Sequence, residues 1–216
     1  MIPILTIVGK SDSGKTTLIE KLVPELSCRG YGVATVKHDV HGFEVDREGK
    51  DSWRHKKAGA VATLIASSSQ LALIQDVGED PSLESLRANY IRGVDIILAE
   101  GYKRTHHPKV EVHRKALRRG LLATKEEGLL AVVTDEPFEV GVPCFELDDI
   151  GGLADFIERE LILPSRRGQE RLSLRVDGEF IPLKPFVERF LREALKGMLS
   201  SLRGCEKGGK VEIEIG

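Results

Sequence analysis

The stretch Gly9-Lys10-Ser11-Asp12-Ser13-Gly14-Lys15-Thr16 decides the fold of this chain. It matches the phosphate-loop pattern Gly-x-x-x-x-Gly-Lys-Ser/Thr in full. Its glycines let the backbone turn so that N–H groups point at phosphate oxygens, and the positive end of the following helix adds to the attraction. An apolar run over 4–8 precedes the loop, and a helical pattern over 15–26 follows it. The segment therefore predicts a site for a nucleoside triphosphate and Mg²⁺.

The loop and one carboxylate predict how the nucleotide and the metal are held. Lys15 is expected to reach the terminal phosphates, and Thr16 to offer its hydroxyl to Mg²⁺. Glu100 ends the apolar run 94–99, where a strand would stop beside the loop, whereas Asp95 lies about 17 Å away at ~3.3 Å per residue. Thr16 and Glu100 are therefore the expected metal ligands. The expected nucleotide-binding residues of the loop are Gly9, Lys10, Ser11, Asp12, Ser13, Gly14, Lys15, Thr16 and Thr17.

Two further carboxylates follow predicted strands. Asp39 comes after the strand 32–37 and either acts with Lys15 and Glu100 in catalysis, by contacting Mg²⁺ through water or orienting the attacking water, or is an ordinary loop residue. Asp135 comes after the strand 129–134 and could accept hydrogen bonds from N1 and N2 of guanine. The Asn-Lys-x-Asp motif that usually reads guanine is absent, so Asp135 is a candidate on position alone.

Short apolar runs alternate with helical patterns along most of the chain, which predicts an α/β fold. We expect a mostly parallel layered sheet of the P-loop NTPase type with helices on both faces, in a domain over 1–163. A polar stretch over 164–170 is the expected linker to a small ββαβ unit over 171–216 of unknown role. The expected strands are 4–8, 32–37, 61–66, 71–75 (paired with 61–66 as a hairpin), 94–99, 129–134, 171–176, 179–181 and 210–215; the expected helices are 15–26, 51–60, 81–91, 149–161 and one opening at Pro185.

Composition argues against several classes of protein. The formal net charge is −2, so the composition has no positive excess that would attract nucleic acid. Aromatic residues make up 5%, too few for a surface on which bases stack. No apolar run approaches the roughly 18 residues of a membrane span. The three cysteines form no C-x-x-C pair, so neither a zinc site nor a disulfide framework is indicated. No targeting segment is recognisable, so we expect a cytoplasmic protein.

Several segments beyond the phosphate loop resemble the molybdopterin-guanine dinucleotide biosynthesis protein B family. They are the loop continued to Leu18, VKHDVHGFEVD at 36–46, GKDSWRHKKAGA at 49–60, LAEGYK at 98–103 and PKVEVHR at 108–114. The resemblance covers about residues 2–162, and the unit 171–216 lies outside it. One departure is Asp39-Val40, where relatives often carry Thr-His, and it weakens the case for a role of Asp39.

The resemblance implies a dimeric GTP-binding protein with weak GTPase activity that acts beside the molybdopterin guanylyltransferase, which joins GMP to molybdopterin. The sequence thus predicts slow Mg²⁺-dependent GTP hydrolysis in molybdenum cofactor biosynthesis. Two alternatives stay open: a small-molecule kinase of the P-loop class, and a non-catalytic nucleotide-binding adaptor that delivers the cofactor. No arginine finger is identifiable, which favours slow turnover.

Basic residues gather in two segments, 37–57 and 103–115, the second including Lys109. Both segments follow predicted strand ends, so they can form a rim around the phosphate loop that attracts an anion such as molybdopterin or its guanine dinucleotide. The alternative is an ordinary solvated surface. The expected rim residues are Lys37, His38, Lys50, Arg54, Lys103 and Arg104.

Overall fold

The computed structural model describes residues 1–39, 42–43, 45–117, 120–136, 140–166, 172, 174–176, 179–181, 183 and 185–201. The chain divides into two compact units, 1–162 and 163–216. In the described part of the chain, no helix combines the length and the apolar character needed to cross a membrane.

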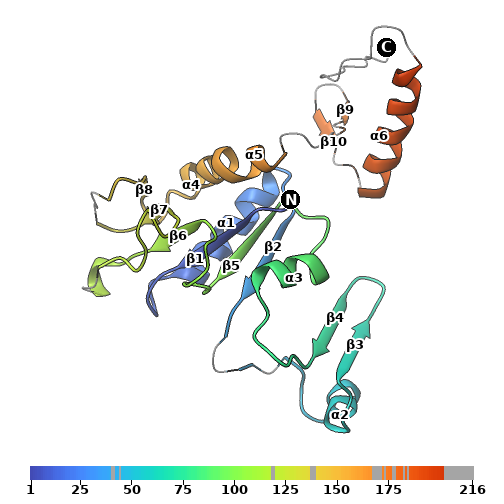
Figure 1. The fold of residues 1–216 in the computed structure, drawn as a ribbon, viewed down its shortest axis with the longest axis horizontal. Helices are drawn as coiled ribbons and strands as arrows, with labels where there is room; N and C mark the ends of the chain where they lie inside the picture. The colour runs from blue at the N-terminus through green and yellow to red at the C-terminus, as the bar shows by residue number, and fades with distance from the viewer. Residues whose placement is uncertain are drawn as a thin grey trace. The chain divides into compact units, whose positions relative to one another are not determined.

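A six-stranded sheet organises the first unit (Figure 1), and all its strand pairs are parallel. The strand order is β2-β5-β1-β6-β7-β8, which puts β1 between β5 and β6. Parallel strands require covered faces and apolar sequences, and β1 is buried along its whole length. The strands are β1 (Ile4–Val8), β2 (Val33–Lys37), β5 (Ile96–Glu100), β6 (Lys109–Val112), β7 (Leu129–Val133) and β8 (Cys144–Phe145).

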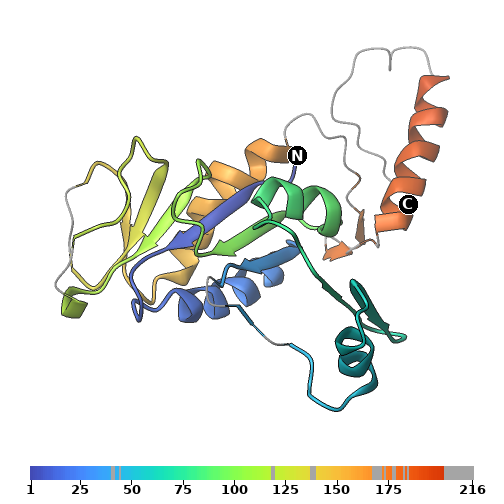
Figure 2. The same ribbon diagram turned by 60° about the horizontal axis from the view of Figure 1, so that its bottom comes forward.

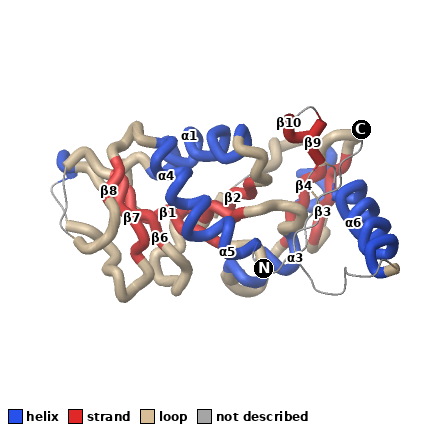
Figure 3. The backbone as a smooth tube through the Cα atoms, turned by 90° about the horizontal axis from the view of Figure 1, so that it is seen from above, coloured by secondary structure: helices blue, strands red, loops and turns tan. Residues whose placement is uncertain are grey.

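Helices cover both faces of this sheet, which confirms the predicted α/β architecture. On one face, α1 (Lys15–Cys28) and α4 (Ile150–Ile157) lie side by side (Figure 3) and share a core with Leu5 and Ile7 of β1. On the other face, α3 (Leu83–Tyr90) buries Leu83 against Ile4 and Ile97. Side chains alternate between the faces along each strand, so β1 contributes side chains to the cores on both faces of the sheet.

Local signals explain where two of the helices begin, and burial explains how far α1 extends. Ser82 caps α3 by accepting a hydrogen bond from the Ser85 amide at 3.1 Å, and Asp149 caps α4 through the Gly152 amide at 3.0 Å. From the sequence, Pro24 is expected to bend the first helix or to mark its last turn, but α1 continues to Cys28 because Leu22 and Leu26 are both fully buried against the sheet. Burial of this apolar face outweighs the single hydrogen bond that proline removes. After α4, the chain continues as a π-helical segment over Glu158–Ile162.

The strand β6 was not predicted, because two of its four residues are charged. Lys109 is 1% exposed, and its ammonium donates to the carbonyls of Thr105 (2.5 Å), His107 (3.2 Å) and Glu127 (2.6 Å). Glu111 is also 1% exposed and accepts hydrogen bonds from the amides of 122 and 123. Burial raises the pKa of the Glu111 carboxyl, and these two amides oppose the shift. The expectation that Lys109 belongs to a basic surface was therefore wrong.

The predicted hairpin is confirmed. β3 (Ala62–Ala66) pairs antiparallel with β4 (Leu71–Gln75), and α2 (Asp51–Lys57) packs on β3. Figures 1 and 2 show these three elements standing apart from the six-stranded sheet.

The second unit contains a β-hairpin and a helix of its own. β9 (Leu174–Val176) pairs antiparallel with β10 (Glu179–Ile181), and α6 (Pro185–Ser200) follows. The short helix α5 (Leu163–Arg166) opens this unit, where the sequence suggested only linker. The turn 177–178 and the predicted strand 210–215 lie outside the described residues.

Candidate functional site

The phosphate loop joins β1 to α1 at the centre of the sheet and is shaped by its two glycines. Gly9 has φ of +149° and Gly14 has φ of +98°, backbone conformations that side chains disfavour. A Cβ atom at Gly9 would lie 2.5 Å from the Val112 carbonyl oxygen and 2.6 Å from Ser13 Oγ, so only glycine fits there. Ser13 is fully buried, and its hydroxyl has no hydrogen-bond partner among the described residues. A phosphate oxygen would satisfy that hydroxyl, so the loop fits a nucleotide.

The Lys15 ammonium lies against its own loop and donates to the Lys10 carbonyl at 2.8 Å. Burial lowers the pKa of Lys15, the nearby charge of Glu100 opposes this, and the charges of Lys103 and Lys37 lower the pKa further. Phosphates bound beside Lys15 would offset the repulsion among these three cations, which the structure brings together.

The predicted metal ligands meet in the structure. The Thr16 hydroxyl donates to the Glu100 carboxylate, at 3.1 Å from Oε1 and 3.2 Å from Oε2. Glu100 ends β5 in register with Ile7 of β1 and Lys37 of β2, so it lies at the carboxyl edge of the sheet beside the loop. Hydroxyl and carboxylate oxygens are hard ligands, and Mg²⁺ completes its shell with phosphates and water. The pair therefore fits a nucleotide-bound Mg²⁺.

The other expected rim residues divide between two places. His38 follows β2, lies 2.8 Å from an Asp80 oxygen through Nε2, and packs on the Tyr102 ring at 4.9 Å between centroids. Arg104 is exposed and comes directly after Lys103. Lys50 and Arg54 instead belong to α2, where Lys50 is the N-cap residue and Arg54 pairs with Asp51 at 3.6 Å. Asp39 is exposed two residues beyond β2.

Arg114, which the sequence placed only within a basic segment, contacts the phosphate loop directly. Its Nε donates to the Ser13 carbonyl at 3.3 Å, and its Nη1 lies 3.9 Å from Asp135 Oδ2. Asp135 also accepts the Lys115 amide at 2.7 Å, and this hydrogen bond is the main reason why the pKa of Asp135 is lowered. Arg114 lies two residues past β6, at the same edge of the sheet as Glu100, and the sequence did not indicate this position because β6 itself was not predicted.

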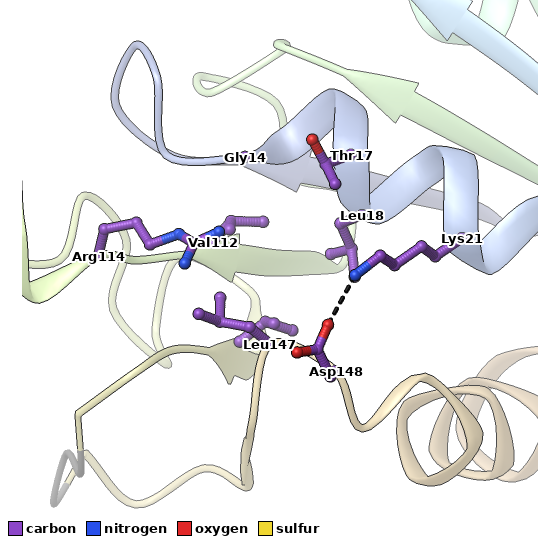
Figure 4. Close-up of a pocket in the computed structure, with 9 residues that line it drawn as sticks. Gly14, Thr17, Leu18, Lys21, Val112, Arg114, Leu147 and Asp148 are labelled. Atoms are coloured by element: carbon purple, nitrogen blue, oxygen red, sulfur yellow. Dashed lines mark hydrogen bonds and ion pairs between the residues drawn. The ribbon is translucent and has the colours of Figure 1, made fainter.

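A small cleft opens between α1, the ends of β6 and β7, and the segments that follow β6 and β8 (Figure 4). Its volume is about 80 Å³. Lys21 Nζ and Asp148 Oδ1 form an ion pair of 2.6 Å at one side of it, opposite Arg114. The lining residues are Gly14, Thr17, Leu18, Lys21, Val112, Arg114, Val133, Leu147 and Asp148.

Comparison with known proteins agrees with this fold. Residues 4–135 match the family model of molybdopterin guanine dinucleotide synthesis protein B. A molybdopterin-guanine dinucleotide biosynthesis adapter protein of Haemophilus influenzae is 40% identical over 161 residues, which cover 74% of this chain and 90% of that protein. The Escherichia coli protein of the same name is 36% identical over 164 residues, covering 73% and 92%.

The second unit also has a counterpart. A relative from Methanocaldococcus jannaschii is 25% identical over 236 residues, covering 98% of this chain and 97% of its own. Among solved structures, a molybdopterin-guanine biosynthesis protein B matches with a TM-score of 0.58 and 33% identity, covering 73% of this chain and 98% of that one. The Bacillus subtilis MobB structure matches with a TM-score of 0.58 and 28% identity, covering 74% and 98%. This chain therefore belongs to the molybdopterin guanine dinucleotide synthesis protein B family.

Proposed function

We propose that this protein binds GTP and Mg²⁺ at the phosphate loop, hydrolyses GTP slowly, and assists the attachment of GMP to molybdopterin. The observation that carries the nucleotide part is the contact between Thr16 and Glu100 beside Lys15. The names of the Haemophilus and Escherichia relatives support the pathway. The proposed partners are the molybdopterin guanylyltransferase and molybdopterin or its guanine dinucleotide.

Each group at the loop has a distinct task in this proposal. Loop amides and Lys15 bind the phosphates, while Thr16 and Glu100 hold Mg²⁺, which neutralises charge on the phosphoryl group. Lys37 and Lys103 add positive charge on the same side, where the phosphate of a pterin would also be attracted. Asp39 stays a prediction as the residue that orients water.

The direct test is a calorimetric titration of the full chain with Mg²⁺–GTP and with Mg²⁺–ATP, with phosphate release followed in parallel. We expect tighter binding of GTP and slow release of phosphate. Equal or tighter ATP binding, with transfer of phosphate to an added acceptor, would favour the small-molecule kinase. GTP binding without any hydrolysis would favour the non-catalytic adaptor.

Glu100→Gln should lower Mg²⁺-dependent phosphate release by roughly tenfold or more, because an amide is a weaker Mg²⁺ ligand than a carboxylate. Asp95→Asn is the matched control. Asp95 lies at the opposite end of β5, where its Oδ2 accepts the Gly32 amide at 2.9 Å. A phosphate-release assay across a Mg²⁺ titration should rank Glu100→Gln below Asp95→Asn; the reverse order would remove Glu100 from the metal site.

The β3–β4 hairpin supports the proposal that the protein is a homodimer. Leu64 and Leu73 are register partners on one face of the hairpin, and Leu71 lies on the same face. Their exposed fractions are 58%, 39% and 67%. An isolated two-stranded hairpin is marginally stable in water. Burying this apolar face against another surface would therefore stabilise the hairpin. We propose that a second copy of the chain covers it.

Leu64→Glu should convert the dimer to a monomer while GTP affinity stays unchanged, because a buried carboxylate at the centre of the interface would lack a partner. Ile65→Glu is the control, since Ile65 is also exposed but points to the other face of the hairpin. Light scattering coupled to size exclusion measures the mass. Equal masses for wild type and Leu64→Glu would show that this face is not the interface.

A further inference from the structure

The two sides of the phosphate loop differ in chemistry. On the β5 side, Thr16 meets Glu100, which marks the metal end of the nucleotide. On the β6 side, the loop carbonyl of Ser13 accepts from Arg114. Because β1 lies between β5 and β6, a triphosphate with its metal on the first side directs its nucleoside toward the second.

The cleft lies on that second side. Gly14, the N-cap residue of α1, and Thr17, Leu18 and Lys21 of the helix lie at three- and four-residue spacing on one face, which begins at the loop itself. The lining as a whole combines apolar surface, suited to the flat face of a base, with three charged groups, one of which is Lys21. The apolar lining residues are Leu18, Val112, Val133 and Leu147, and the charged groups beyond β6 and β8 are Arg114 and Asp148.

We propose that this cleft receives the base of the nucleotide and that Asp148 is the residue that selects guanine. The inference rests on the proposed GTP binding and adds where and how the base is read. A carboxylate accepts two hydrogen bonds, which matches the N1–H and N2–H₂ donors of guanine. Adenine presents an unprotonated N1 at the same position, so its lone pair faces the carboxylate. The planar Arg114 guanidinium can stack on the face of the base.

The contact between Lys21 and Asp148 does not prevent this role. The side chains are 46% and 87% exposed, and exposed ion pairs contribute little stability, so a base can displace Lys21 from the carboxylate. Lys21 is then free to approach the guanine O6 acceptor or the ribose. Asp135 is less well placed, since its carboxylate accepts the Lys115 amide and it does not line the cleft.

The test exploits xanthine, which carries an oxygen where guanine carries the N2 amino group. In the full chain with Mg²⁺, Asp148→Asn should weaken GTP binding by roughly tenfold or more and tighten xanthosine triphosphate binding by a similar factor. An asparagine offers one donor and one acceptor, which matches xanthine. Affinity for inorganic tripolyphosphate, which has no base, should not change. Asp155→Asn is the control, because Asp155 lies on α4, pairs with Arg29 and is absent from the cleft lining.

The outcomes separate this inference from the proposed function. Wild-type protein that binds neither GTP nor tripolyphosphate would overturn both. GTP and tripolyphosphate binding by the wild type, with unchanged GTP preference in Asp148→Asn, would overturn the inference alone. The same exchange of preference in Asp135→Asn, and not in Asp148→Asn, would assign the base to the loop after β7 and also overturn it.

Discussion

Lys15→Ala should weaken Mg²⁺–GTP binding by roughly 10- to 100-fold while the fold stays intact. Hydrogen bonds to charged groups contribute about 1.5–3 kcal/mol, and each 1.4 kcal/mol is tenfold in affinity. Among the described residues, the ammonium hydrogen-bonds to the Lys10 carbonyl alone, so its loss removes no core packing. Titration calorimetry measures the affinity, and circular dichroism checks the fold.

Lys57→Ala is the matched control for Lys15. It removes a lysine on α2, where the ammonium lies 5.6 Å from the Trp53 ring centroid, and should leave GTP affinity unchanged. The affinity for tripolyphosphate should fall in Lys15→Ala together with that for GTP, since Lys15 contacts phosphates and not the base. Wild-type affinity in Lys15→Ala would refute the assignment of the phosphate site.

Lys109→Met should lower the free energy of unfolding by about 2–4 kcal/mol. Methionine keeps the length of the side chain, but three carbonyl oxygens lose a charged donor in a place that is almost closed to water. The loops over 101–108 and 124–128 are both tied to that ammonium, so they should loosen together. Urea unfolding followed by circular dichroism measures the change.

Lys125→Met is the control for this substitution, since Lys125 is exposed in the loop that Lys109 holds. Its effect should stay within about 0.5 kcal/mol, as for other surface changes. A similar small effect for Lys109→Met would mean that water replaces the ammonium at the three carbonyls. Hydrogen exchange of the amides in 101–108 provides a second measurement, with faster exchange expected in Lys109→Met alone.

The central strands and the phosphate loop could be predicted because their signals are local. The run Ile4–Val8 is apolar throughout, and a glycine-rich loop follows at once. Glu100 could be predicted from its position at the end of an apolar run, and the structure places it against Thr16. The Asp-Gly hairpin signal and the helix from Pro185 likewise depend on short stretches, and the structure shows elements in both places.

Features that depend on tertiary neighbours could not be predicted. In β6, Lys109 and Glu111 are satisfied by loop atoms from the segments 105–107 and 122–127, which no window around 109–112 contains. The cleft could not be predicted for the same reason. Arg114, Leu147 and Asp148 meet α1 only because β6, β7 and β8 follow β1 in the sheet order.

The strand order has a consequence for the growing polypeptide during translation. Among the described strands, β1 pairs with β5 and β6, so during synthesis it finds its partners about 90 to 105 residues later in the chain. At typical elongation rates of about 5–20 residues per second, its apolar side chains wait for several seconds. During that interval the hairpin β3–β4 can form from local contacts, but the central sheet cannot. Of the described strands of this sheet, β1 waits longest for its partners, so the segment that carries the phosphate loop is the one most open to aggregation during synthesis.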